Sequence, residues 1–127
     1  MKKNLVYTDL DVYKACRMLR KRVSLLVKQY FPEHEKHRLS DQVIRSSRSI
    51  TANIAEGNGR YYYKDNVRFC RISKGSLQET LEHFITAYDE EYIDSEVLKE
   101  FKKEHDTCIR LLNGYIRYLL SNKNKEF

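Results

Sequence analysis

The chain has 127 residues, a length that fits one domain with a single core, and 41% of the residues are hydrophobic. One Pro and four Gly are too few for the many turns of an all-β sandwich or barrel, and no apolar run approaches the length of a transmembrane helix. Lys and Arg outnumber Asp and Glu by 24 to 18, which gives a net charge of +6. Three widely spaced cysteines fit a reducing compartment, and Asp9 and Asp11 interrupt any apolar export signal, so we expect a cytoplasmic protein.

The first predicted helix covers about residues 9–31 and ends at Pro32, which lacks a backbone N–H. Its apolar residues recur every three or four positions, the pattern of one buried helical face. They are Val12, Cys16, Leu19, Val23, Leu26 and Tyr30. The remaining faces carry a cluster of cations: Arg17, Arg20, Lys21, Arg22 and Lys28. Such a face either attracts a polyanion in a salt-dependent manner or is an ordinary solvated helix surface.

The second predicted helix covers about residues 41–56, with Ser40 as its N-cap and Gly57 as its stop. Small side chains are frequent in it, so a neighbouring helix can approach closely, and we expect this helix to be the most enclosed. The third predicted helix covers about residues 65–91. Gly75 in its interior costs about 1 kcal/mol relative to Ala, which is tolerable where a neighbour needs the space.

The fourth predicted helix covers about residues 95–120 and begins after Asp94 and Ser95, both suitable caps. Short connections join the four amphipathic segments, so adjacent helices must reverse direction. The sequence therefore predicts an all-α fold, a single antiparallel up-down-up-down four-helix bundle over residues 1–127.

No pattern typical of a catalytic or metal site is found. Glu79 and His83 are four residues apart rather than three, and the second pair that a di-metal bundle needs is missing. His34 and His37 lack a Cys or carboxylate motif, while His105 and the three cysteines fall on apolar faces, which is typical of buried core residues. We therefore expect no enzymatic activity, no metal and no cofactor.

A polar stripe follows the apolar face of the second helix. Its members are Gln42, Arg45, Ser49, Asn53 and Glu56. One interpretation is a hydrogen-bond network that fixes helix pairing or subunit register, in which Arg45 and Glu56 meet partners such as Glu79 and Arg60. The other interpretation is a ligand or RNA site lined by Arg45 and Asn53.

Three consecutive tyrosines, Tyr61–Tyr63, lie between Arg60 and Lys64 and are followed by Arg68 and Arg71. Aromatic rings framed by cations suit single-stranded RNA, because bases stack on the rings while the cations hold phosphates. A tyrosine that caps the bundle end or enters an oligomer contact would give the same pattern. Three adjacent rings cannot all face one core, so we expect some ring to be available to a partner.

The run QVIRSSRSITANIAEGNGR (42–60), followed by RFCRISKGSLQE (68–79), closely resembles the four-helix-bundle family named for 23S rRNA intervening sequences. The residues that match its pattern are Gln42, Arg45, Ser49, Ile50, Asn53, Ile54, Ala55, Glu56, Gly57, Gly59, Arg60, Gly75, Ser76 and Glu79. The triple tyrosine lies outside that pattern, so any role that it has belongs to this chain.

The resemblance implies a cytoplasmic bacterial protein that forms a closed cyclic homo-oligomer, typically a homopentamer, without an established catalytic activity. It also implies a distant relation to the accessory variability determinant proteins of diversity-generating retroelements, which bind a reverse transcriptase and nucleic acid.

Two functional hypotheses follow. In the first, the protein binds nucleic acid, RNA in preference to DNA, through the basic face of the first helix together with Arg60 and Tyr61–Tyr63. In the second, it is a protein-interaction scaffold or accessory subunit that recruits an enzyme, and its contact with nucleic acid is incidental. In both, no membrane is involved.

Overall fold

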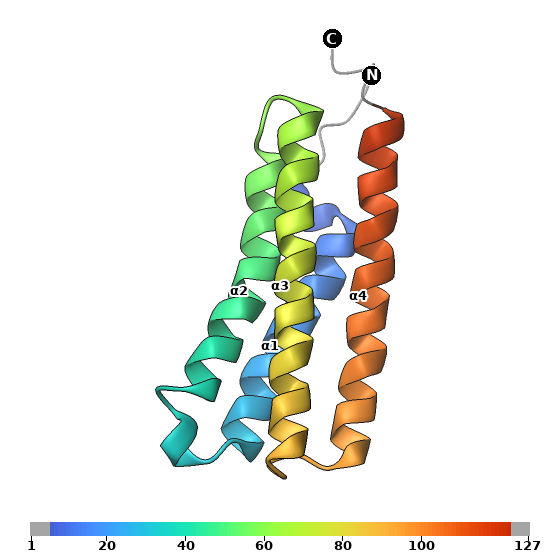
Figure 1. Ribbon diagram of the computed structural model, residues 1–127. Helices are drawn as coiled ribbons and strands as arrows, with labels where there is room; N and C mark the ends of the chain where they lie inside the picture. The colour runs from blue at the N-terminus through green and yellow to red at the C-terminus, as the bar shows by residue number, and fades with distance from the viewer. Residues whose placement is uncertain (1–5, 123–127) are drawn as a thin grey trace.

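The structure, a computed structural model, describes residues 6–122 and consists of helices joined by short connections. The elements in chain order are η1 (Tyr7–Asp9), α1 (Asp11–Tyr30), η2 (Glu33–Glu35), α2 (Leu39–Asn58), α3 (Tyr63–Asp89) and α4 (Ser95–Ser121), where η marks a 3-10 turn. Consecutive long helices lie side by side and run in opposite directions (Figure 1). The predicted all-α four-helix bundle is confirmed, and each helix end lies within two residues of its expected place.

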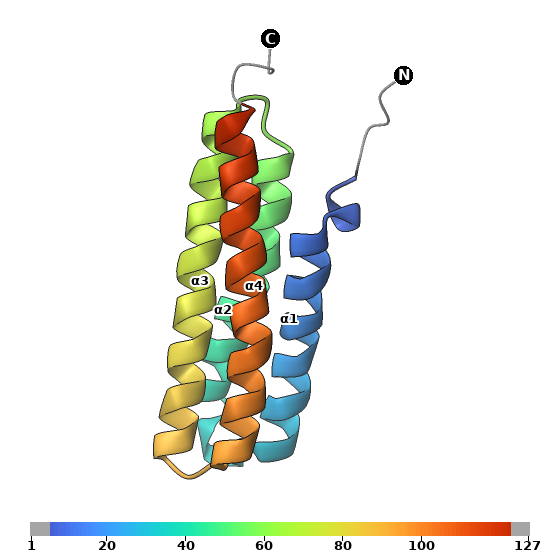
Figure 2. The same cartoon turned by 90° about the vertical axis from the view of Figure 1, so that its right-hand side faces the viewer.

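The four helices surround one core. Figures 1 and 2 together show α1 and α3 at opposite corners, with α2 and α4 between them. The apolar faces read from the sequence meet along the bundle axis, where the largest fully buried side chains are Phe84, Phe101, Leu19, Ile50, Ile54, Leu77 and Leu112. This arrangement leaves the polar faces of all four helices on the surface of the chain.

Two predicted helix ends are confirmed. Phe31 has extended backbone angles, with φ −81° and ψ 134°, so α1 ends at Tyr30 and Phe31 is the cap that precedes Pro32. At the start of α4, the Asp94 carboxylate accepts a hydrogen bond from the backbone N–H of Val97 at 2.9 Å, as an N-cap does.

The predicted cap and stop residues of the second helix are wrong. Ser40 is not a cap but a buried residue inside α2, because the Glu35 carboxylate from the preceding turn accepts the backbone N–H of Leu39 at 3.1 Å. Gly57 does not stop the helix, which continues to Asn58, and none of the glycines in residues 6–122 has a positive φ.

Gly57 instead permits the close approach of α2 and α3. A Cβ at this position would lie 2.7 Å from Oδ1 of Asn66 and 2.9 Å from Cβ of Phe69.

Deeper in the same interface, Ser46 and Thr80 share a hydroxyl hydrogen bond of 2.8 Å, and Ser73 donates to the carbonyl of Ile50 at 2.7 Å. Small and hydroxyl-bearing residues thus pair α2 with α3 tightly. With nine of its 20 residues buried, against five of 20 in α1 and nine of 27 in α3, α2 is the most enclosed helix described, as predicted.

Candidate nucleic-acid interface

The cations of α1 lie on the outside of the bundle. Arg17, Lys21, Arg22 and Lys28 are exposed, and Arg20 is half-buried. No Asp or Glu occurs between residues 12 and 32, so nothing within α1 beyond its first residue neutralises these charges. We call the surface formed by these five residues the basic face of α1.

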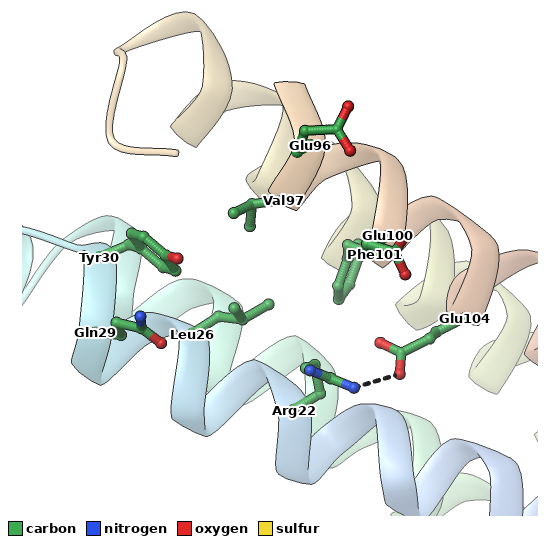
Figure 3. Close-up of a pocket in the computed structure, with 9 residues that line it drawn as sticks. All are labelled: Arg22, Leu26, Gln29, Tyr30, Glu96, Val97, Glu100, Phe101 and Glu104. Carbon is green, nitrogen blue, oxygen red and sulfur yellow. Dashed lines mark hydrogen bonds and ion pairs between the residues drawn. The ribbon is translucent and has the colours of Figure 1, made fainter. Parts of the chain in front are cut away.

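One member of this face points away from the others. Arg22 forms an ion pair with Glu104 of α4 at 2.9 Å, as Figure 3 shows. The pair borders a groove of about 280 Å³ between α1 and α4, whose α4 side carries Glu96, Glu100 and Glu104. Three carboxylates in one groove repel phosphate, so the α4 side of α1 is unfavourable for a nucleic-acid strand.

The opposite side of α1 faces α2 and gathers cations. Nη1 of Arg20 donates to Oγ1 of the buried Thr51 at 2.8 Å, which fixes the guanidinium across the α1–α2 boundary. Arg48 of α2 lines the same cavity as Arg20 and Lys21. The sequence interpretation missed Arg48, although the absence of Asp and Glu between residues 42 and 55 is a signal that could have drawn attention to it.

The three tyrosines divide between surface and core. Tyr61 and Tyr62 are 71% and 50% exposed, and their rings meet edge to face with centroids 4.7 Å apart. Tyr63 is half-buried and packs against the core, as a residue that caps the bundle end would. Arg60 is held by Glu56, at 2.7 Å, and lies over the ring of Phe69.

The predicted nucleic-acid residues therefore form two groups rather than one. Tyr61 and Tyr62 lie in the connection between α2 and α3, at one end of the bundle (Figure 1). The basic face runs along α1, and Lys28 lies near the other end, in the last turn of that helix. A strand that contacts both groups must extend along the bundle.

The polar stripe of α2 forms part of the predicted network. Ser49 and Ser76 share a hydroxyl hydrogen bond of 2.8 Å that joins α2 to α3, and Asn53 donates to the carbonyl and hydroxyl of Ser49. The expected pairing of Glu56 with Arg60 is present.

The other expected pairing of the stripe, Arg45 with Glu79, is not formed. Arg45 pairs with Asp41 one helical turn away, at 3.0 Å, and Glu79 pairs with His83. Gln42 is exposed. Partners one turn away on the same helix are reached with little loss of side-chain freedom, which explains the preference. The outer members of the stripe thus face solvent in the chain.

The buried titratable groups are core residues. All three cysteines are buried, and burial raises the pKa of Cys70 to about 11. Burial lowers the pKa of His105, whose Nε2 lies 3.0 Å from the carbonyl of Leu77. No group of three or more His, Cys, Asp or Glu in residues 6–122 is placed to hold a metal ion. Within the same residues, no helix has the length and apolarity to cross a membrane.

Comparison with known proteins assigns the chain to a family. The sequence pattern of the 23S rRNA-intervening sequence proteins matches residues 8–114. The chain belongs to this family. A similar solved structure is that of a protein with unknown function from the S23 ribosomal protein family of Bacteroides thetaiotaomicron VPI-5482. It has a TM-score of 0.75 and 25% identity, over 83% of this chain and 97% of that one. No curated protein matches.

The family match includes all of α1, α2 and α3 and most of α4. The basic face, the polar stripe and the connection that carries Tyr61 and Tyr62 thus all lie within the matched residues. The TM-score supports the same four-helix arrangement in the S23 family protein.

Proposed function

We propose that this member of the 23S rRNA-intervening sequence protein family is a non-enzymatic, cytoplasmic homo-oligomer that binds nucleic acid, RNA in preference to DNA. The observation that carries the proposal is the charge on the α1–α2 side of the bundle. Residues 12–32 and 42–55, which form the walls of that side, contain Lys and Arg but no Asp or Glu.

The charge on this side is available to a ligand. Within residues 6–122, Arg17, Lys21 and Lys28 form no ion pair, whereas Arg22 is already paired with Glu104. Cations without partners release counterions when phosphates replace those ions, which is the main source of affinity for a nucleic-acid backbone. Arg17, Lys21 and Lys28 are therefore the principal phosphate contacts of the basic face.

Preference for RNA rests on Tyr61 and Tyr62. Two exposed rings at the bundle end suit unpaired bases, which are common in the loops of folded RNA and rare in duplex DNA.

The homo-oligomer that we propose is a cyclic pentamer, as the family resemblance implies. The surface of α3 that carries Ile72 and Gly75 suits a subunit contact. Ile72 is 43% exposed there, and no atom outside the helix's own backbone lies within 4 Å of a Cβ built on the exposed Gly75. A cyclic ring joins this surface to a second, different patch of the next subunit; where that patch lies away from α1, the ring leaves the basic face uncovered and repeats its charge.

The test is binding of a fluorescently labelled structured RNA, and of duplex DNA of the same sequence, followed by anisotropy near physiological salt. The variant Arg17→Glu/Lys21→Glu/Lys28→Glu should lose RNA binding while its oligomer mass is unchanged. The control Lys99→Glu/Lys102→Glu/Arg117→Glu makes the same change in net charge on exposed positions of α4 and should bind as the wild type does. Equal losses of RNA binding in both variants would mean that the protein binds RNA only as a general polycation, without a specific role for the basic face.

A protein-interaction scaffold is the second candidate. Met18 and Leu25, 62% and 63% exposed, lie among the cations of α1, and exposed apolar side chains suit a protein partner. This candidate predicts that the wild type binds neither RNA nor DNA above low salt. The same anisotropy experiment therefore separates the two functions.

A further inference from the structure

A cavity of about 330 Å³ opens between α1 and α2, lined by Arg20, Lys21, Ser24, Leu25 and Arg48. We propose that this cavity binds a phosphate group and that, in the complex with RNA, this group is an internal phosphate of the strand backbone. The inference rests on the proposed function and assigns one of its contacts to a defined place. Two guanidinium groups, an ammonium group and a hydroxyl are the donors that phosphate oxygens accept from.

No carboxylate competes for these donors. The neighbouring arginines on the two helices are occupied, Arg22 by Glu104 and Arg45 by Asp41. Lys21 and Arg48, by contrast, form no ion pair within residues 6–122. The cavity thus keeps its charge, while the groove on the other side of α1 carries three glutamates. An anion is favoured on the α2 side of α1 alone.

The Arg20 side chain of the cavity is held in position before a ligand binds. Arg20 uses one of its five N–H donors on Oγ1 of Thr51, at 2.8 Å, and Thr51 is buried in α2. The guanidinium is therefore held beside Arg48 before a ligand arrives, which lowers the entropy lost on binding. Thr51 lines no part of the cavity and acts as a positioning residue through Arg20.

The apolar wall favours a phosphate carried on a sugar over the free anion. Leu25 lies on the rim with an exposed side chain, where the ribose of the same nucleotide can contact it. The cavity is open to solvent, so a strand can pass across it. An internal backbone phosphate fits these features better than a chain terminus does.

The first test compares thermal unfolding in sodium phosphate with unfolding in sodium chloride of equal ionic strength. The wild type should show a saturable rise in Tm with phosphate, and Arg48→Gln should lose it. The control Arg71→Gln removes the same charge from an exposed position on α3 and should keep the rise. A rise that is absent from the wild type, or equal in Arg48→Gln, would overturn the site.

Thr51 gives a test that leaves the net charge unchanged. Thr51→Val removes the hydroxyl that holds Arg20 and should weaken the response to phosphate, while Thr51→Ser, which keeps the hydroxyl, should retain it. If Thr51→Val and Thr51→Ser respond alike, Arg20 is not positioned by this bond. The same phosphate response in the wild type and in both Thr51 variants, which share one net charge, would overturn a preorganised site.

The source of the phosphate is tested with two labelled RNA oligonucleotides that differ only in a 5′-hydroxyl or 5′-monophosphate end. Both should bind the wild type equally, and Arg48→Gln should bind both about tenfold more weakly. A loss confined to the 5′-monophosphate strand would overturn the internal-phosphate assignment. RNA binding unchanged in Arg48→Gln would overturn the site but leave the proposed function standing. A phosphate response without any RNA binding would support the cavity and overturn the nucleic-acid function.

Discussion

Gly57 and Gly75 both lie within helices, but an added methyl group meets different surroundings at the two positions. At Gly57 a Cβ would lie less than 3 Å from both Asn66 and Phe69, so α2 and α3 would have to move apart. At Gly75 nothing lies within 4 Å. We predict that Gly57→Ala lowers the free energy of unfolding by about 1–3 kcal/mol. Within a single chain, Gly75→Ala should raise it by up to about 1 kcal/mol, because Ala favours the helix. Urea unfolding at one protein concentration measures both, and similar effects at the two sites would contradict the packing described.

His105 predicts a pH dependence at the residue scale. Burial lowers its pKa below the ordinary value of 6.5, so the unfolded chain binds a proton there before the folded chain does. Stability contributed by neutral His105 is therefore complete above about pH 6.5 and is lost as the pH falls toward the lowered pKa. Between pH 7.5 and 5.5 the wild type should lose more stability than His105→Gln. Parallel losses in the two proteins, followed by chemical unfolding, would show that His105 does not carry this dependence.

The sequence predicted the buried helix faces well, because these faces follow from the spacing of apolar residues along the chain. The buried residues of α1 include Val12, Cys16, Leu19 and Val23, all predicted from spacing alone. The start of α2 was predicted less well, because the carboxylate that accepts its first N–H belongs to Glu35 in the preceding turn. The conformation of the connecting turn decides this detail, and the spacing of apolar residues does not specify that conformation.

At the scale of elements, the α2–α3 interface depends on buried hydroxyls. Thr80 bonds to Ser46 in the core, at 2.8 Å, whereas the exposed Thr107 bonds only to a carbonyl of its own helix. We predict that Thr80→Val costs about 1 kcal/mol of stability and that Thr107→Val costs much less. In a double-mutant cycle, Thr80→Val and Ser46→Ala should be less than additive. Full additivity would mean that the two hydroxyls do not stabilise the interface together.

At the scale of the whole molecule, the proposed subunit contact is tested by mass. Ile72→Glu places a charge on the exposed part of α3 and should lower the molar mass measured by light scattering toward that of one 15.3 kDa chain. Tyr118→Glu, at an exposed position on α4, should leave the mass unchanged. A wild type that already has the mass of one chain would exclude self-association, and an Ile72→Glu protein of full mass would place the contact elsewhere.

The charge pattern of the molecule was only partly predictable from the sequence. The cations of α1 lie close together in the chain and were therefore predictable. Which of them faces the acidic surface of α4 and which faces the basic surface of α2 depends on helix packing. Arg22 turns toward Glu104 on α4, while Arg20 turns toward Thr51 and Arg48 on α2. Residues that are 28 or more positions apart in the chain meet only in the fold, so no single-helix pattern could group them.

The most direct test of the central claim is the salt dependence of RNA binding. The logarithm of the affinity should fall linearly with the logarithm of the salt concentration, with a slope of about 0.7 for each phosphate contacted on a single strand. The variant Arg17→Glu/Lys21→Glu/Lys28→Glu, measured where it still binds at low salt, should have a slope smaller by about 2, since three contacts are lost. Equal slopes in the wild type and the variant would contradict the account, because the phosphates would then be held by another surface.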